Sequence, residues 1–338
     1  METDSPDEVD RQLFHAVVIA PRAPFRLLAD VIGVSDQTIA RRYRKLVSAF
    51  GLRVTGVLNG VPLGWTDWYV RLQVMPGSAD SIARALAGRP DTRWITLASG
   101  GTEIACVLQA RAPEERDDLF LRGLPGSRRV TQITAQSILC VYSPVEWAAI
   151  TSTLSADQVA VLRASDAYPG NVPRDPPPTE DLAIEPVSLR PEDHLLLAEL
   201  ARDGRASHAS LAAALHWHES TVRRRIEELQ QRRALYFDVD VHEDFLGVGL
   251  AAMLWLAVDP AHLDATGRAI ARHPEVPFAA ATTGNTNLVV SAQFQGTRHM
   301  YQYLTTRLTG LSGIRSVETS PVIGRFKQAG PATPRLSG

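Results

Sequence analysis

Two similar stretches decide the fold of this chain: residues 34–46 read VSDQTIARRYRKL, and residues 217–229 read WHESTVRRRIEEL. Both lie inside a longer repeat, because residues 10–46 align without a gap with residues 193–229 at a constant offset of 183. Ten of the 37 aligned positions are identical, whereas average residue usage would give roughly two or three matches by chance. The chain therefore carries one helical module twice.

Each copy of the module predicts three helices with a tight turn between the second and the third. Apolar residues recur at helical spacing in the third helix, at Ile39 and Leu46 in the first copy and at Val222 and Leu229 in the second. A short helix, a turn and a basic amphipathic helix form a helix-turn-helix, whose last helix enters the major groove of DNA. One basic helix alone is most often a solvated surface, but the repetition in register favours a DNA-binding function. The predicted helices span residues 8–20, 25–32, 36–49, 191–202, 208–216 and 219–232.

We predict that double-stranded DNA is the partner of these modules and that the third helix of each, the recognition helix, contacts it. Residues near the N-terminus of such a helix meet base edges, and a serine cap there leaves backbone amides able to face a phosphate. Glutamine suits adenine and arginine suits guanine. The expected base-facing set is Gln37, Thr38, Arg41, Ser220, Thr221 and Arg224, and the cap is Ser35. The expected phosphate contacts are Arg42, Arg44, Lys45, Arg223 and Arg225.

The second copy departs from the first at two places. Glu227 and Glu228 stand where the first copy has Arg44 and Lys45, and residues 216–218 read His-Trp-His where the first copy has the turn Gly-Val-Ser. Loss of two positive charges weakens attraction to a phosphate backbone. The second module is therefore predicted to be a poorer DNA reader or a structural remnant.

Each helical module is followed by a segment of alternating strands and helices. The order strand, helix, strand, strand, helix, strand predicts a ferredoxin-like βαββαβ sandwich with its helices on one face. Glycine turns join the two middle strands at Gly100 and Gly284, an offset of 184. The predicted strands span residues 68–74, 93–98, 103–108, 130–141, 250–258, 278–283, 288–294 and 314–323, and the helices residues 78–87, 113–121, 262–273 and 298–308.

The predicted fold class is therefore α+β, with two winged-type helix-turn-helix domains and two ferredoxin-like domains in tandem. A Pro-rich connector with a short helix capped by Ser155 joins the halves, and a disordered tail ends the chain. The predicted boundaries are 8–58 and 189–241 for the helix-turn-helix domains, 59–142 and 242–328 for the ferredoxin-like domains, 143–188 for the connector and 329–338 for the tail.

Composition is that of an ordinary globular protein, with a net charge of −2, so the positive charge is local. The longest apolar stretch, residues 245–258, is too short to span a bilayer, and the acidic N-terminus is unlike a secretory signal. We expect no membrane association and a cytoplasmic location, where Cys106 and Cys140 stay reduced. His216 and His218 lack the spacing of metal ligands, so we expect no metal and no cofactor. Catalytic motifs are also missing, and we expect no enzyme activity.

These residues resemble the Lrp/AsnC (feast/famine) family of bacterial transcription regulators. The resemblance lies in residues 10–13, 28–29, 34–42, 51–54 and 62–64 of the first half, and in residues 211–212, 220–226, 229 and 245–247 of the second. Family members usually carry one such unit, so this chain looks like a tandem fusion of two. The resemblance implies that the sheet domains pair face to face into dimers and higher homo-oligomers. It also implies a small-molecule effector, often an amino acid, bound near the hairpin turns.

The implied effector contacts lie at the two glycine turns. Glu103 follows the first turn and can accept an ammonium group, while exposed turn amides can receive a carboxylate. Asn287 stands at the equivalent place in the second turn and lacks the charge, so two ordinary hairpin turns without a ligand remain the alternative. The residues implied are Ser99, Gly100, Gly101, Thr102, Glu103, Thr283, Gly284, Asn285 and Asn287.

The favoured interpretation is a sequence-specific DNA-binding transcriptional regulator modulated by a small molecule. We expect the sheet domains to form a pseudo-dimer, within one chain or across two, that sets the DNA readers roughly 34–36 Å apart. Fused proteins of this build also serve as sirohaem decarboxylases in tetrapyrrole metabolism, which is the alternative function. A non-enzymatic amino-acid sensor that controls a partner protein is a third possibility.

Overall fold

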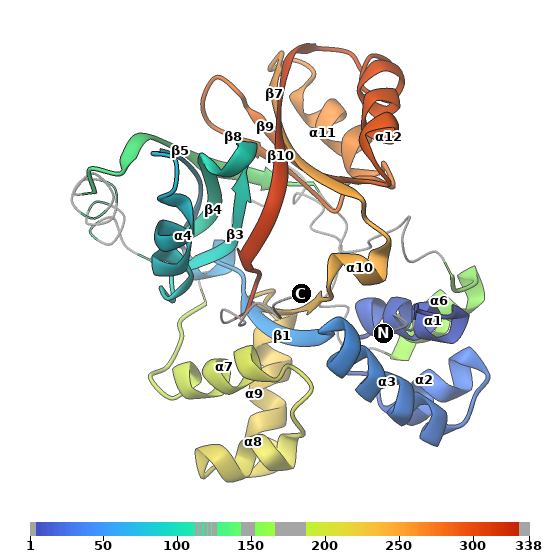
Figure 1. Cartoon of the computed structure of the whole chain (residues 1–338). Coiled ribbons are helices and arrows are strands. Elements are labelled where there is room, and N and C mark those ends of the chain that lie inside the picture. Colours follow the sequence, from blue (N-terminus) through green and yellow to red (C-terminus); the bar gives the residue numbers. More distant parts are fainter. Residues whose placement is uncertain are drawn as a thin grey trace. The chain divides into compact units, whose positions relative to one another are not determined.

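The computed structural model describes residues 5–111, 127–142, 153–165 and 187–330, with single residues between 112 and 126. The chain forms two compact units, and each unit draws on both halves of the sequence (Figure 1). Most of the predicted tail, most of the connector and much of the helix predicted over residues 113–121 lie outside the described residues. The helical unit contains residues 1–59, 144–174 and 188–248, and the sheet unit contains residues 60–143, 175–187 and 249–338.

The first helix-turn-helix domain begins with a capping box, in which the Asp7 side chain accepts from the Asp10 amide and the Asp10 side chain accepts from the Asp7 amide. The turn between its second and third helices uses Gly33 in the left-handed region, at φ 83°, which a glycine adopts without strain. Its core is formed by Leu13, Leu28, Ile39 and Leu46, all fully buried. The helices are α1 (Glu8–Ile19), α2 (Phe25–Ile32) and α3 (Asp36–Phe50).

The second helix-turn-helix domain repeats this arrangement with a different turn. His216 takes the left-handed position that Gly33 holds in the first domain, at φ 55°. Leu196, Leu211, Val222 and Leu229 form the equivalent buried core. The helices are α7 (Asp193–Arg202), α8 (His208–Leu215) and α9 (Glu219–Gln231). The six helices confirm the predicted helix-turn-helix pattern.

A two-stranded antiparallel ribbon joins the two helix-turn-helix domains inside the helical unit. Strand β1 (Arg53–Leu58) follows α3, strand β6 (Leu235–Asp240) follows α9, and the pairing runs from Arg53 opposite Asp240 to Leu58 opposite Leu235. Each domain thus contributes its strand to a shared element.

Two further short helices are described in the helical unit. Helix α6 (Ala156–Ser165) packs against α1 and α2, and Ser155 caps it by accepting from the amide of Gln158, as predicted. Helix α10 (Glu243–Leu246) places Phe245 edge-on against the rings of Phe14 and Phe50. The aromatic contacts tie the chain after β6 to the first domain.

The sheet unit contains two ferredoxin-like lobes. In the first lobe the fully described helix is α4 (Ala79–Ala87), and in the second lobe the described helices are α11 (Leu263–Ala271) and α12 (Thr297–Gln302), the last continuing as one π-turn over Tyr303–Arg307. The first lobe has strands β2 (Thr66–Val74), β3 (Thr92–Ala98), β4 (Glu103–Ala110) and β5 (Val130–Val141). The second has β7 (Leu250–Val258), β8 (Phe278–Thr282), β9 (Leu288–Phe294) and β10 (Ile314–Lys327).

The described strands of both lobes form one closed antiparallel barrel in the order β10-β3-β4-β2-β5-β8-β9-β7. If the four strands of each lobe are counted in chain order, they lie side by side in the order second, third, first, fourth. This is the predicted ferredoxin-like topology. The lobes meet where β5 pairs with β8 and where β10 pairs with β3. The expected pseudo-dimer therefore forms within one chain. Strand β10 extends to Lys327, beyond the predicted Ile323, because its last residues pair with β3.

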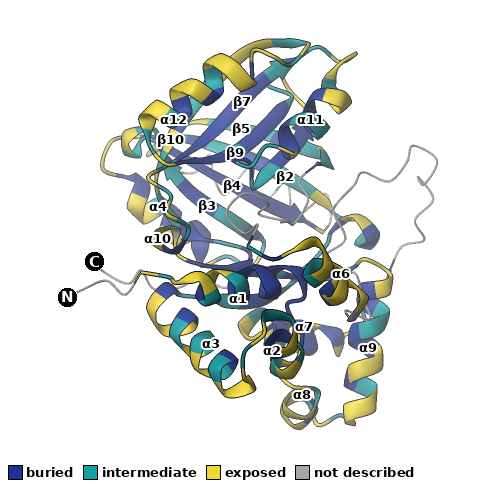
Figure 2. Cartoon of the chain, turned by 90° about the vertical axis from the view of Figure 1, so that its right-hand side faces the viewer, coloured by how far each residue is buried: buried dark blue, intermediate teal, exposed yellow. Residues whose placement is uncertain are grey.

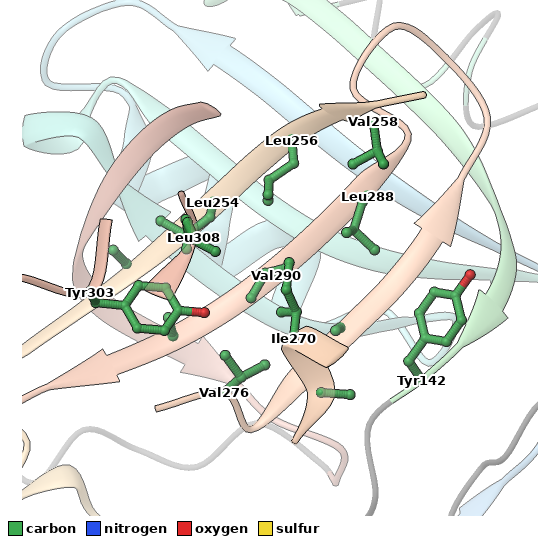
Figure 3. Close-up of a cluster of buried hydrophobic side chains, with 14 of the residues drawn as sticks. Tyr142, Leu254, Leu256, Val258, Ile270, Val276, Leu288, Val290, Tyr303 and Leu308 are labelled. Atoms are coloured by element: carbon green, nitrogen blue, oxygen red, sulfur yellow. The ribbon is translucent and has the colours of Figure 1, made fainter. Parts of the chain in front are cut away.

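Alternate residues of each strand serve two different cores, since successive side chains point to opposite faces of a sheet. In the first lobe, Val70 and Leu72 pack with the helix α4, whereas Tyr69 joins Met253 and Trp255 of the second lobe in a shared core. The barrel strands are largely buried, and the helices expose one face (Figure 2). Figure 3 shows the core of the second lobe, where strand residues meet α11 and the ring of Tyr303. None of the described helices is long and apolar enough to cross a membrane.

Candidate nucleic-acid interface and effector turns

The start of α3 carries the predicted cap and an exposed polar face. Ser35 Oγ accepts from the amide of Thr38 at 3.2 Å and lies 2.9 Å from the Thr38 hydroxyl. Gln37 and Arg41 are exposed on the first turns of the helix. Arg44 is also exposed, although its Nε donates to the Ala40 carbonyl one turn earlier at 3.2 Å. This face of α3 presents a guanidinium and an amide where a recognition helix needs them.

Two of the predicted phosphate contacts instead face the first helix of their own domain. Arg42 Nη1 lies 2.6 Å from Asp7 and 3.3 Å from Asp10, and Lys45 Nζ lies 3.0 Å from Asp10. The Asp10 carboxylate is completely buried, and its charge is balanced by these two cations. Arg42 and Lys45 therefore fix α3 against α1, and each remains about one fifth exposed.

Arg225 is the second-domain counterpart of Arg42 and is more deeply engaged. Its Nε and Nη2 donate to the two oxygens of Asp193 at 2.8 and 2.5 Å, and its Nη1 lies 2.7 Å from Glu228. The Arg225 side chain is 7% exposed and the Asp193 side chain 1%. Arg225 thus holds α9 against α7, a position unlike the phosphate contact predicted for it.

The other predicted residues of α9 lie at the surface. Ser220, Arg223 and Arg224 are exposed and Thr221 is half-buried, while Arg223 lies 3.3 Å from Glu219. At the N-cap, among the described residues, the His218 side chain forms no hydrogen bond to the first turn, in contrast to Ser35 in the first domain. The helix that the sequence predicted to be the poorer reader also has the less completely capped N-terminus.

Sequence reasoning missed two arginines that join the helix-turn-helix domains. Arg22 donates to the carbonyls of Gly204 and Ala206, the latter at 2.9 Å. Arg205 donates to the carbonyls of Pro21 and Ala23 at 2.5 and 2.7 Å. The signal was present in the repeat, since this pair is identical at the offset of 183 although it lies outside both recognition helices.

Aromatic rings cover both of these guanidinium groups. Arg22 lies 5.2 Å from the ring centre of Phe237, and Arg205 lies 5.0 and 5.2 Å from those of Phe25 and Tyr43. A guanidinium over an aromatic face gains further electrostatic stabilisation. The two arginines therefore act as a matched clamp between the domains.

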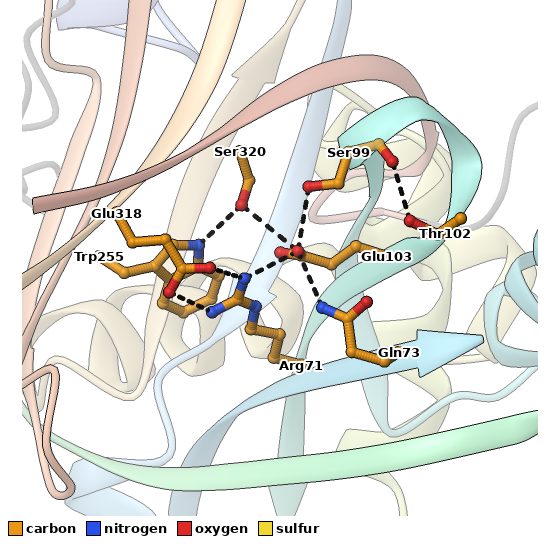
Figure 4. Close-up of polar contacts among 8 residues, drawn as sticks. All are labelled: Arg71, Gln73, Ser99, Thr102, Glu103, Trp255, Glu318 and Ser320. Carbon is orange, nitrogen blue, oxygen red and sulfur yellow. Dashed lines mark hydrogen bonds and ion pairs between the residues drawn. The ribbon is translucent and has the colours of Figure 1, made fainter.

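The first glycine turn leads into a dense polar cluster (Figure 4). Glu103 is 1% exposed, and its Oε2 accepts from Arg71 at 2.8 Å, from Gln73 and Ser99 at 3.1 Å each, and from Ser320 at 3.3 Å. Gly100 and Gly101 take positive φ, and the Thr102 hydroxyl donates to the Ser99 carbonyl. The carboxylate predicted to receive an ammonium group is therefore bonded to a guanidinium of the same chain.

The second glycine turn is closed by an amide. Gln136 on β5 donates to the carbonyls of Thr283 and Thr286 at 2.7 and 3.0 Å, and a Cβ at Gly284 would clash with this amide. Asn287 bonds both backbone groups of Val258, at 2.8 and 2.9 Å. Asn285 is exposed at the tip. The Thr283 carbonyl and the Asn287 side chain, both predicted as ligand groups, are therefore bonded to residues of the same chain.

The described residues include no cluster of three or more histidine, cysteine, aspartate or glutamate side chains placed to hold a metal ion. Cys106 is buried and Cys140 half-buried, and both are free thiols. Burial raises the pKa of the Cys106 thiol to about 12, so this group is an inert member of the first-lobe core.

Comparisons with known proteins identify the domains. Residues 7–47 and 193–230 match the AsnC-type helix-turn-helix domain, and residues 251–332 match the Lrp/AsnC ligand binding domain. An uncharacterized HTH-type transcriptional regulator of Pyrococcus horikoshii is 24% identical over 135 residues, which cover 40% of this chain and 85% of that protein. A similarly named protein of Pyrococcus furiosus is 26% identical over 129 residues, covering 38% of this chain and 87% of that protein.

A whole-chain likeness comes from a solved structure. The siroheme decarboxylase NirDL superposes with a TM-score of 0.61 at 15% identity, over 95% of this chain and 93% of that one. At this identity the likeness concerns the fold, and it supports the tandem arrangement of two units. The domain matches show that the chain carries an AsnC-type helix-turn-helix domain in each half and an Lrp/AsnC ligand binding domain in the second half, which is consistent with a tandem two-unit form.

Proposed function

We propose that the protein is a transcriptional regulator that binds double-stranded DNA with α3 and α9 of a single chain. The observation that carries this proposal is the clamp of Arg22 and Arg205, which together with the β1–β6 ribbon holds two recognition helices in one unit. Classical helix-turn-helix proteins need two symmetric copies to read two half-sites. Here both copies are supplied by the repeat.

Exposed and half-buried residues of the two recognition helices would divide the DNA contacts between two half-sites. Gln37, Thr38 and Arg41 would face the bases of one half-site, and Ser220, Thr221 and Arg224 those of the other. Arg44 and Arg223 would contact phosphates. We assign Arg42, Lys45 and Arg225 first to anchoring the recognition helices, because their charges are matched by Asp10 and Asp193. Since the two base-facing sets differ, the operator should be an imperfect palindrome.

The proposal is tested by selecting bound duplexes from a random pool and then titrating the best sequence at several stated salt concentrations. Arg41→Ala should cost on the order of 1–3 kcal/mol of binding free energy if the side chain pairs with a guanine, and it should relax the preference at one base pair. Arg84→Ala, on the surface of the sheet unit, is the matched control. Failure of the intact protein to bind any duplex at low ionic strength would contradict the proposal.

The whole-chain likeness to NirDL keeps a tetrapyrrole enzyme as the second candidate. Against it, the inner faces of the two lobes are joined by a packed apolar core that includes Tyr69, Met253, Trp255 and Val289. A tetrapyrrole between these faces would have to displace that core. A visible absorption spectrum of freshly purified protein separates the candidates, because a bound tetrapyrrole absorbs strongly where polypeptide does not.

The family resemblance also supports regulation by a small molecule and assembly of chains through the sheet unit. We retain both as part of the proposal, with an amino acid as the effector class. Size measurements with and without each amino acid test them, since an effector changes assembly only by binding one state more tightly than another.

A further inference from the structure

We propose that the chain supplies its own ligand at the first turn, where the guanidinium of Arg71 takes the cation position beside the buried carboxylate of Glu103. The inference rests on the effector part of the proposed function and restricts it, because an effector's ammonium group cannot reach Oε2 of Glu103 while Arg71 is bound there. It predicts that the first turn keeps its conformation without a bound amine. Its test is made on the protein without DNA.

The first argument is charge. Glu103 is almost completely buried, and a buried carboxylate is strongly destabilising unless a cation and hydrogen bonds balance it. Arg71 Nη2 lies 2.8 Å from Oε2 of Glu103, and neutral donors from Gln73, Ser99 and Ser320 complete the coordination of that oxygen. The position that an effector's ammonium group would take against this oxygen is therefore filled.

The second argument is that Arg71 is held in place from its other side. It donates through Nη1 and Nη2 to the Glu318 carboxylate, at 3.0 Å for Nη1, and its guanidinium lies 4.7 Å from the ring centre of Trp255. Burial alone would lower the pKa of Arg71, but its hydrogen bonds to Glu318 and Glu103 raise it, so the group stays cationic. A paired, stacked guanidinium is a fixed ligand and not a mobile surface charge.

The third argument is that the contacts cross between the lobes. Arg71 and Glu103 belong to the first lobe, whereas Trp255, Glu318 and Ser320 belong to the second. Trp255 Nε1 donates to Ser320 Oγ at 3.3 Å, and Ser320 in turn reaches Glu103. The internal ligand therefore fastens the seam where β10 pairs with β3.

The second turn shows that this charge pair is particular to the first. At the offset of 184, Trp255 is the counterpart of Arg71, and Asn287 is the counterpart of Glu103. Ser320 of the second lobe corresponds to Gln136 of the first. At the seam between β5 and β8 the equivalent place is taken by the neutral amide of Gln136, beside the backbone pairing of the two strands. A charged internal ligand thus occurs at one of the two equivalent seams. Removing Arg71 should therefore leave a cation position empty at the first turn only.

The experiment is chemical rescue of Arg71→Ala, read by thermal unfolding of the full chain. The variant should melt several degrees below wild type, and millimolar ethylguanidinium should restore part of that loss, whereas uncharged ethylurea should not. Wild type and Arg84→Ala, which removes an exposed arginine paired with Asp80, should show no response to ethylguanidinium. In an Arg71→Ala, Glu103→Gln double variant the rescue should disappear, because the carboxylate that receives the cation is gone.

Three outcomes would overturn the inference: a melting temperature of Arg71→Ala equal to that of wild type, equal rescue by ethylurea, or rescue that persists without Glu103. If Arg71→Ala does not fold, Arg71→Gln is used in the same comparison, since it keeps more of the side-chain volume. DNA binding is measured separately on the wild-type protein. A failure to bind DNA would contradict the regulator function without affecting the interpretation of the rescue experiment.

Discussion

Arg22 and Arg205 occupy equivalent positions in the two helix-turn-helix domains, and each donates to two backbone carbonyls of the other domain's loop. The acceptors are equivalent as well, since Gly204 and Ala206 correspond to Pro21 and Ala23 at the offset of 183. Such mutual contact of a patch with its own copy defines the interface of a twofold symmetric dimer. In this protein it forms between two segments of one polypeptide.

Arg205→Ala should loosen this clamp. It removes two hydrogen bonds from a charged donor and the contacts with the Phe25 and Tyr43 rings, and it leaves the carbonyls of Pro21 and Ala23 without this donor. We expect a loss of about 3 kcal/mol in the free energy of unfolding of the helical unit, measured by urea denaturation. Arg202→Ala, an exposed arginine three residues earlier, should change it by less than about 1 kcal/mol. Equal effects of the two substitutions would contradict the clamp.

Neighbouring arginines of α9 should separate stability from DNA binding. Arg225→Ala strands the buried Asp193 carboxylate and should cost about 3–5 kcal/mol of unfolding free energy. Arg224→Ala removes an exposed side chain and should leave stability unchanged while weakening binding to the second half-site. Urea denaturation and a duplex titration measure the two effects. Weakened DNA binding by Arg225→Ala with no loss of stability would show that its phosphate contact, not its anchoring, dominates.

Acid should weaken the second helix-turn-helix domain through Asp193. Burial alone would raise the pKa of Asp193, but hydrogen bonds from Arg225 and from the Arg190 amide outweigh it and hold this pKa below its ordinary value of 3.8. A carboxyl group with a depressed folded-state pKa stabilises the protein above its unfolded-state pKa and loses that contribution as pH falls through the folded-state value. Stability should therefore fall as the pH drops below 3.8.

Asp193→Asn provides the comparison for this pH dependence. The variant should be less stable than wild type at neutral pH, and the difference should shrink in acid because the wild-type carboxyl group becomes neutral too. Urea midpoints on both sides of pH 3.8 measure it. A difference that stays constant with pH would show that Asp193 titrates normally.

Adding a glycine to one turn and removing the glycine from the other should have opposite effects on the stability of the two helix-turn-helix domains. His216 has φ 55° and Gly33 has φ 83°, a region where a side chain costs about 1–2 kcal/mol. His216→Gly should raise the melting temperature, whereas Gly33→Ala should lower it. The loss at Gly33 comes from backbone strain alone, because a Cβ there would meet no atom within 4 Å. Opposite shifts confirm the assigned conformations.

Local elements could be predicted from the sequence because their signals are local. The apolar spacing of Ile39 and Leu46, the cap at Ser35 and the glycine at residue 33 all lie within one stretch of chain, and α3 ends one residue after its predicted limit. The ferredoxin-like order followed from the same kind of reasoning. The closure of the barrel did not, because pairing of β5 with β8 depends on segments nearly 150 residues apart, and the sequence does not specify which edges meet.

The roles of individual arginines were harder to predict. Arg41 and Arg42 are adjacent and equally basic, but only Arg42 turns toward Asp10. The information was in the repeat, since Asp10 and Arg42 recur together as Asp193 and Arg225 with the same separation of 32 residues. A pair of opposite charges repeated with its spacing indicates a structural ion pair. Likewise, Glu103 was predicted as a ligand site because the sequence does not show that Arg71 lies beside it.

Joining both halves of the clamp in one polypeptide frees each half to evolve alone. In a homodimer every substitution appears twice, but here the second copy has Glu227 and Glu228 where the first has Arg44 and Lys45. The association is also unimolecular, so dilution does not separate the partners as it separates two chains. A cell with few copies of this protein would still have the two helix-turn-helix domains paired in every copy.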